Sequence, residues 1–299
     1  MKNDNETTKE GVIYALLAFA FWGLAPIYFK LLLTVLPTEI LLHRVLWSLV
    51  FLLLALIFTK KLGRVLFYFK SPKIILLLTT TSLLVATNWG IYIWAINNDL
   101  LIEASLGYYI NPLVNILLGF IFLKEIPTKA GKIAILLAVI AVLYQVYSIG
   151  KLPIISLSLA TLFGFYGLIR KKISLPSLDG LFIETALITP IALIYWAYLF
   201  SLNESQFFIN STTTFLLILS GPVTILPLLA FNSAATRLKL STIGYFQYLA
   251  PTISFLLAII VYKEPLSKEK LITFLLIWLA LALVTLETYF RQRKYYKRK

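Results

Sequence analysis

Apolar stretches of about twenty residues recur along this 299-residue chain, and they constrain its fold more than any other feature. A helix needs roughly 20 apolar residues to cross a bilayer core about 30 Å thick. Some 60% of the residues are hydrophobic and 13% are charged, whereas a soluble domain carries about 25% charged residues. Because backbone groups in lipid must pair within their own segment, each stretch is expected to be a helix. The sequence therefore predicts an all-α integral membrane protein.

The apolar stretches are separated by short links, and ten of them are long enough to count as spans. The sixth is the shortest and contains Gly164 and Gly167, so its helix is the least strongly indicated. We therefore expect ten transmembrane helices at 11–33, 38–58, 73–96, 101–123, 129–148, 152–169, 178–200, 212–236, 240–262 and 271–290.

The net charge of +14 comes from Lys and Arg in short loops and in the C-terminal tail. Such residues gather in the cytoplasmic loops of membrane proteins. If the N-terminus is cytoplasmic, 21 of the 27 basic residues lie inside, four lie outside, and Lys30 and Arg44 fall within spans. This bias predicts that both termini are cytoplasmic, and it gives the positive charge a role that involves no nucleic acid.

Two segments resemble each other at an offset of 139 residues. Residues 104–125 and 243–264 share a Tyr, a Pro, a Lys and a Glu at matched positions, and weaker similarity at an offset of 140 relates 39–44 to 179–184. Each copy holds five spans, so the second copy must enter the membrane from the opposite side. Inverted repeats of this kind are typical of secondary transporters, which bind substrate near the midplane between the repeats.

These boundaries divide the chain into four parts. They are a cytoplasmic N-terminal segment at 1–10, a first five-helix repeat at 11–148, a second at 152–290 and a basic cytoplasmic tail at 291–299. The expected partners are the lipid bilayer and a small-molecule substrate, and the chain is expected to be a monomer or a homodimer.

Other function classes are less well supported by the composition. With no cysteine and one histidine, the chain lacks the usual ligands of a transition-metal site, and no cofactor or metal is expected. It contains no phosphate-binding glycine loop that would indicate an ATP-driven pump. We therefore expect a permease that works by alternating access. A channel or lipid scramblase is the alternative, and a membrane-embedded enzyme is less favoured still.

Several segments are similar to those of a known family: WGLAPIYFK (22–30), EILLHRVLWS (39–48), NWGIYIWAINN (88–98), EASLGYYINPLVNILLGFIFLKE (103–125), FYGLIRKK (165–172) and AATRLKLSTIGYFQYLAPT (234–252). Across essentially its whole length the chain resembles the RarD-type permeases of the EamA family, in the drug/metabolite transporter superfamily. The resemblance implies inverted five-helix halves, residence in the bacterial cytoplasmic membrane, and transport of a drug or metabolite. RarD-type proteins have been linked to chloramphenicol sensitivity, but the resemblance supplies no physiological substrate.

Arg44 is a basic residue inside a predicted span, where a charge costs about 2.5–3.5 kcal/mol on insertion scales. Two interpretations stay open. Arg44 either pairs with Glu39 or Glu103 and holds helices together, or faces a cavity and binds an anionic or strongly polar group with its fork of donors. The neighbouring His43 is either a packed residue or a proton relay.

Three glutamates also have two interpretations each. Glu184 corresponds to Arg44 in the repeat, and it either pairs with Arg237 or titrates as a proton-coupling group. Glu125 and Glu264 each follow a lysine at the end of a span. We expect them to cap or anchor the next helix rather than to touch substrate.

Polar and aromatic residues gather in the third, fourth and ninth spans. Asn111 and Asn115 share a helical face, and Pro112 and Pro251 remove backbone donors within spans. Such a lining suits an amphipathic organic molecule, including an amino-acid-like one, although tryptophans also collect at membrane interfaces. The predicted substrate-binding residues are Arg44, Asn88, Tyr108, Asn111, Gln247, Trp22, Trp94 and Tyr248, and the coupling candidates are His43 and Glu184.

Overall fold

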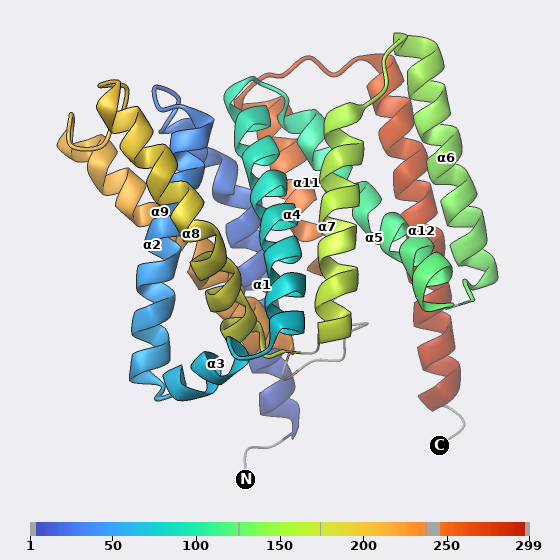
Figure 1. Ribbon diagram of the computed structural model, residues 1–299. Coiled ribbons are helices and arrows are strands. Elements are labelled where there is room, and N and C mark those ends of the chain that lie inside the picture. Colours follow the sequence, from blue (N-terminus) through green and yellow to red (C-terminus); the bar gives the residue numbers. More distant parts are fainter. Residues whose placement is uncertain (1–3, 125, 174, 236, 238–245, 297–299) are drawn as a thin grey trace.

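The computed structural model describes residues 4–296 except 125, 174, 236 and 238–245. Its elements, coloured along the chain in Figure 1, are all helical. They are α1 (Asp4–Lys30), α2 (Pro37–Phe58), α3 (Leu62–Tyr68), α4 (Pro72–Asn97), α5 (Leu101–Leu123), α6 (Lys129–Ile149), α7 (Ile154–Ile173), α8 (Ser177–Ser201), α9 (Ser211–Ala235), α11 (Leu249–Leu256), the π-helix η1 (Leu257–Val261) and α12 (Lys268–Tyr296).

The prediction of an all-α membrane fold is confirmed for the described residues, which contain no strand. Eight helices are long and apolar enough to cross a membrane, and two apolar helices at Ile154–Arg170 and Leu249–Val261 are shorter. Most ends of the predicted spans lie within four residues of the helix ends, but α1 begins seven residues before its predicted span and α12 ends six residues after its own. The end of the eighth predicted span and the start of the ninth fall outside the described residues. The sequence does not predict α3, because its seven residues are too few to give the apolar signal of a membrane span.

The helices form one bundle with a separate flank (Figure 1). On the flank, α6 packs against α12, while α5 packs against α7 and α1 packs against both α9 and α11. In Figure 1, α1 and α7 run in opposite directions, and so do α6 and α12. The same view shows the start of α1 and the end of α12 at the same end of the bundle.

Two glycines let neighbouring helix pairs approach closely. A Cβ added at Gly23 of α1 would lie 2.7 Å from the Cβ of Ile253 and 3.0 Å from the carbonyl oxygen of Ala250 on α11. A Cβ at Gly164 of α7 would lie 2.9 Å from a methyl group of Val114 on α5. Small residues at such crossings are how membrane helices gain packing without a hydrophobic driving force.

Glu264 joins the end of one apolar segment to the start of another. Its carboxylate accepts hydrogen bonds from the backbone N–H groups of Leu101 and Ile102, both at 2.9 Å, and only 6% of the residue is exposed. These donors are unsatisfied at the start of any helix, and they favour a negative charge. The predicted capping role is therefore confirmed, but the capped helix is α5 and not the helix that follows. Its sequence counterpart, Glu125, lies outside the described residues.

Candidate functional site

A cavity of about 380 Å³ lies inside the bundle. Its volume is within the range that takes a small organic ligand. The described lining residues come from α1, α2, α4 and α5 in the first half of the chain, and from α7, α8, α9, α11 and the residue Gln247 in the second. The flanking helices α6 and α12 contribute none of them. The wall consists of Phe19, Trp22, Ala25, Phe29, Arg44, Val85, Trp89, Tyr92, Tyr108, Asn111, Pro112, Phe163, Tyr166, Arg170, Leu181, Val223, Thr224, Leu228, Phe231, Gln247, Ala250, Pro251 and Ser254.

Arg44 lines the cavity although only 8% of the residue is exposed. Its Nε donates a hydrogen bond of 2.7 Å to Oγ1 of Thr224, whose own hydroxyl donates to the carbonyl of Ser220. The guanidinium carbon lies 4.0 Å from the ring centroid of Trp89 and 5.6 Å from that of Phe29. Arg44 Nη1 has no hydrogen-bond partner among the described residues. An aromatic cage thus holds a guanidinium with one end free.

Arg44 forms no ion pair with Glu39 or Glu103, the two carboxylates that were expected to make it a structural residue. Glu39 accepts hydrogen bonds from Ser205 and the backbone of Gln206, and Glu103 lies 3.4 Å from the amine of Lys270. Both carboxylates that the sequence offered to Arg44 therefore have other partners.

Tyr108 and Asn111 bring polar atoms of α5 to the cavity. Tyr108 donates to Oδ1 of Asn88 at 3.3 Å, and Asn88 in turn donates to the carbonyl of Leu159 on α7 at 2.9 Å. Asn88 is fully buried behind the lining, where its amide links α4, α5 and α7. Asn111 is 6% exposed, and its Oδ1 lacks a partner in the described part of the chain. A residue of the cavity wall therefore also carries an unsatisfied acceptor.

A second charged cluster lies at the wall formed by α7 and α8. Glu184 accepts hydrogen bonds from Thr81 at 2.6 Å and Tyr166 at 3.4 Å, and Nε of Arg170 lies 3.7 Å from its carboxylate. Tyr166 and Arg170 line the cavity, whereas Glu184 lies behind them with its side chain 2% exposed. The expected partner of Glu184, Arg237, instead lies 3.4 Å from Glu10. The prediction of a Glu184–Arg237 pair is therefore wrong.

Comparison with known proteins agrees with this architecture. The EamA-like transporter family matches residues 9–147. "Protein RarD" of Salmonella typhi is 46% identical over 292 residues, which cover 97% of this chain and 99% of that protein. An "Uncharacterized transporter" of Vibrio cholerae is 46% identical over 288 residues, 96% of this chain and 95% of the other. The chain belongs to the EamA-like transporter family. It is a multi-pass membrane protein, and several of its relatives are named as transporters.

A solved structure supports the fold of this EamA-like chain. That structure, entitled "Crystal structure of protein", has a TM-score of 0.58 and 19% identity, and the match covers 94% of this chain and 98% of the other. At this identity the likeness concerns the fold alone.

Besides Asn88 and Glu184, which lie behind the lining, three more of the residues predicted for the site of this EamA-like transporter lie off the cavity wall. Trp94 is 45% exposed on α4, and Tyr248 packs against the buried residues of the main hydrophobic core. His43 is fully buried, with its ring stacked on Phe207 at 4.5 Å and edge-on to Trp196 at 5.3 Å. Neither ring nitrogen of His43 has a hydrogen-bond partner among the described residues.

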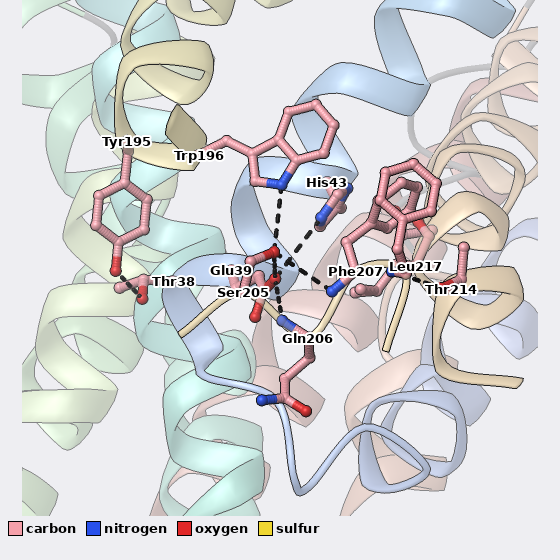
Figure 2. A network of polar contacts seen from close by, with 12 residues as sticks. Thr38, Glu39, His43, Tyr195, Trp196, Ser205, Gln206, Phe207, Thr214 and Leu217 are labelled. Atoms are coloured by element: carbon pink, nitrogen blue, oxygen red, sulfur yellow. Dashed lines mark hydrogen bonds and ion pairs between the residues drawn. The ribbon is translucent and has the colours of Figure 1, made fainter. Parts of the chain in front are cut away.

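The His43 region is organised by Glu39, as Figure 2 shows. The Glu39 carboxylate accepts from the Ser205 hydroxyl at 2.7 Å and from the Gln206 N–H at 2.9 Å, and it lies 3.9 Å from Nε2 of His43. Trp196 donates to the same serine hydroxyl at 3.3 Å. The loop between α8 and α9 is thereby fixed to the start of α2.

A matching contact fixes the segment between α2 and α4. Arg64 of α3 donates two hydrogen bonds, of 2.7 and 2.8 Å, to the fully buried carboxylate of Asp179 at the start of α8. These bonds raise the pKa of Arg64 above its usual value. In this EamA-like fold each of α2 and α8 therefore begins with a carboxylate that holds a connection of the other half.

The structure adds cavity residues that the sequence reading did not select. The sequence places Arg170 among the cytoplasmic loop charges, because it opens the Arg-Lys-Lys run after the sixth predicted span. In the structure α7 continues to Ile173, and Arg170 turns into the cavity. The predicted site includes Trp94 but not Trp89, and the two lie on different faces of α4. The available signal was the spacing of Arg170, which lies four residues beyond Tyr166 and so shares a helical face with it.

Proposed function

We propose that this chain is a secondary active transporter that moves a small amphipathic organic molecule across the bacterial cytoplasmic membrane by alternating access. The observation that carries the proposal is the cavity, whose lining is divided between the two halves of the chain while α6 and α12 stay outside it. A site shared by two halves changes its access when the halves rock against each other. The molecule carried is a metabolite or a drug.

The two halves, 11–148 and 152–290, are proposed to be inverted five-span repeats with ten crossings in all. The packing of the helices supports this. α5 packs against α7 as α11 packs against α1, and α4 packs against α7 and α8 as α9 packs against α1 and α2. Each of these contacts turns into its counterpart when the two halves are exchanged. The opposite directions of α1 and α7 in Figure 1 fit an inversion.

Both termini are proposed to be cytoplasmic. This is supported by Figure 1, in which the start of α1 and the end of α12 lie at the same end of the bundle, and by the bias in basic residues. Moving Arg170 from the cytoplasmic loops to the cavity changes the count from 21 to 20 inside, against four outside. The bias therefore persists after the correction.

Substrate binding is proposed at Arg44, Trp22, Tyr108, Asn111 and Gln247, which all line the cavity. Asn88 is proposed to position Tyr108 through the hydrogen bond between them. Proton coupling is proposed at Glu184 rather than at His43. The reason is that Glu184 reaches the cavity through Arg170 and Tyr166, whereas His43 is packed between aromatic rings.

Transport by purified protein in proteoliposomes tests the proposal. Radiolabelled amino acids, nucleosides and chloramphenicol are screened for uptake and for counterflow against an unlabelled internal pool. A transporter gives saturable counterflow for at least one compound, and an imposed pH gradient changes its rate. Ion-like flux without saturation or counterflow would contradict the transporter proposal. A rate that ignores the pH gradient would contradict proton coupling alone.

A further inference from the structure

The charges around the cavity do not balance, and the imbalance lies at one residue. The described lining contains two cationic side chains, Arg44 and Arg170, and no carboxylate. Arg170 has Glu184 at 3.7 Å, so its charge is matched from behind the wall. Arg44 has a threonine hydroxyl and two aromatic rings as its neighbours, and none of these carries a negative charge.

A buried cation without an anion is expensive to keep, because the protein replaces only part of the hydration that the ion has lost. The aromatic faces of Trp89 and Phe29 recover some of this loss through cation–π attraction, but they leave the formal charge in place. Nη1 is buried and has no hydrogen-bond partner among the described residues, so it is an unsatisfied donor that an anion would pair with.

We propose, building on the transporter function above, that the substrate is an organic monocarboxylate with a flat apolar body, and that Arg44 is its charge-recognition residue. One negative charge brings the sum of Arg44, Arg170 and Glu184 from +1 to zero, whereas a dianion would overshoot. A planar carboxylate fits the fork of a guanidinium. The surrounding Trp22, Trp89 and Phe231 supply the flat apolar walls.

Asn111 gives the body of the substrate a second requirement. Asn111 lines the same cavity, and its Oδ1 is buried and accepts no hydrogen bond from the described residues. A donor on the body of the substrate would satisfy it. The site is therefore selective against organic cations, which would meet Arg44 with a like charge, and it favours carboxylates that carry an N–H or O–H group on the ring.

Binding of matched probes to the purified full-length chain in nanodiscs tests the charge requirement. The probes are 3-(indol-3-yl)propionate, its primary amide and the corresponding amine, with the same three head groups on a naphthalene body that lacks the N–H. Isothermal titration gives their dissociation constants. The carboxylates are expected to bind at least about tenfold more tightly than the amides, because hydrogen bonds to charged groups are the stronger class, and the amines more weakly still.

Variants separate charge recognition from packing. Arg44→Gln is expected to remove the preference for carboxylate over amide, Arg44→Lys to keep part of it, and Asn111→Leu to remove only the advantage of indole over naphthalene. Lys270→Gln is the control, since it removes one positive charge from α12, which gives no residue to the described lining. If Arg44→Gln fails to elute as a folded protein, Arg44→Lys and Asn111→Leu carry the test.

Three results would overturn the proposal: no carboxylate binds to the wild-type chain, amides or amines bind as tightly as carboxylates, or the carboxylate preference survives in Arg44→Gln. Each is distinguishable from failure of the transporter function. A protein that shows saturable counterflow of a neutral or cationic compound is a transporter without this anion site.

Discussion

Arg44 and Glu184 occupy the eighth positions of α2 (Pro37–Phe58) and α8 (Ser177–Ser201), and their surroundings are opposite in kind. Glu184 is held by a guanidinium, a threonine and a tyrosine, whereas Arg44 is held by one hydroxyl and two aromatic rings. Glu184 is paired with a cation of the protein itself. Arg44 has no anionic partner among the described residues, so its counter-charge is proposed to come from the substrate.

Five residues earlier the same two helices are alike. Glu39 and Asp179 are the third residues of α2 and α8, both are fully buried carboxylates, and each holds a connection from the other half. At the starts of α2 and α8, the two halves therefore use the same kind of residue, a buried carboxylate, for the same structural purpose. The residues beside the cavity have diverged to opposite charges.

The largest expected effect concerns the paired charge. Arg170→Ala leaves Glu184 buried with an uncompensated charge, so we expect the free energy of unfolding to fall by about 3 kcal/mol. Denaturation of the purified protein in mixed micelles measures it. The double variant with Glu184→Gln should recover most of the loss, and a double variant as unstable as Arg170→Ala would break the contrast between the two charges.

Arg44→Ala is expected to act on transport and not on stability. It removes the cation on which binding is proposed to depend, so kcat/KM should fall by about a hundredfold, as for the loss of a charged hydrogen bond. The free energy of unfolding should stay within about 1 kcal/mol of wild type, because the buried charge that is removed has no acidic partner. Poor membrane insertion with unchanged kcat/KM in the inserted fraction would assign Arg44 to packing instead.

Gly23 and Gly164, one in each half and both at close helix crossings, sharpen the comparison of the two halves. Gly23→Ala would press a methyl group against the backbone oxygen of Ala250 and the Cβ of Ile253, and is expected to cost about 1–3 kcal/mol. Gly164→Ala meets the movable methyl groups of Val114 and Leu118, and should cost less. Thermal unfolding of both variants gives the order, and equal losses would mean that α1 adjusts to the added methyl group as easily as α7.

The smallest effects are expected at the two helix starts. Glu39→Gln keeps an acceptor for Ser205 and Gln206, and Asp179→Asn keeps one for Arg64, so each should lower the melting temperature by only a few degrees. Similar losses at the two sites would support their equivalence. A large loss at one alone would show that the two halves use these carboxylates differently.

Helix positions were predictable from the sequence, because a helix that crosses lipid needs a long apolar segment and each predicted span contains one. Side-chain partners were not. Arg237 and Arg170 were equally available to Glu184 by sequence, and only the rotation of α7 about its axis brings Arg170 inward. For the same reason the sequence did not show that Trp89 lines the cavity, whereas Trp94, which was predicted for the site, is exposed.

The most direct test of the alternating-access account uses two single cysteines in this cysteine-free chain, Ser220→Cys and Leu228→Cys. They lie one turn either side of Thr224 on one face of α9, and Leu228 lines the cavity while Ser220 is 1% exposed. A membrane-impermeant thiol reagent is applied to each face of proteoliposomes with and without substrate. The account predicts that labelling of the two cysteines comes from opposite faces and changes in opposite directions when substrate is added. Simultaneous labelling of both from both faces would show a pore and contradict it.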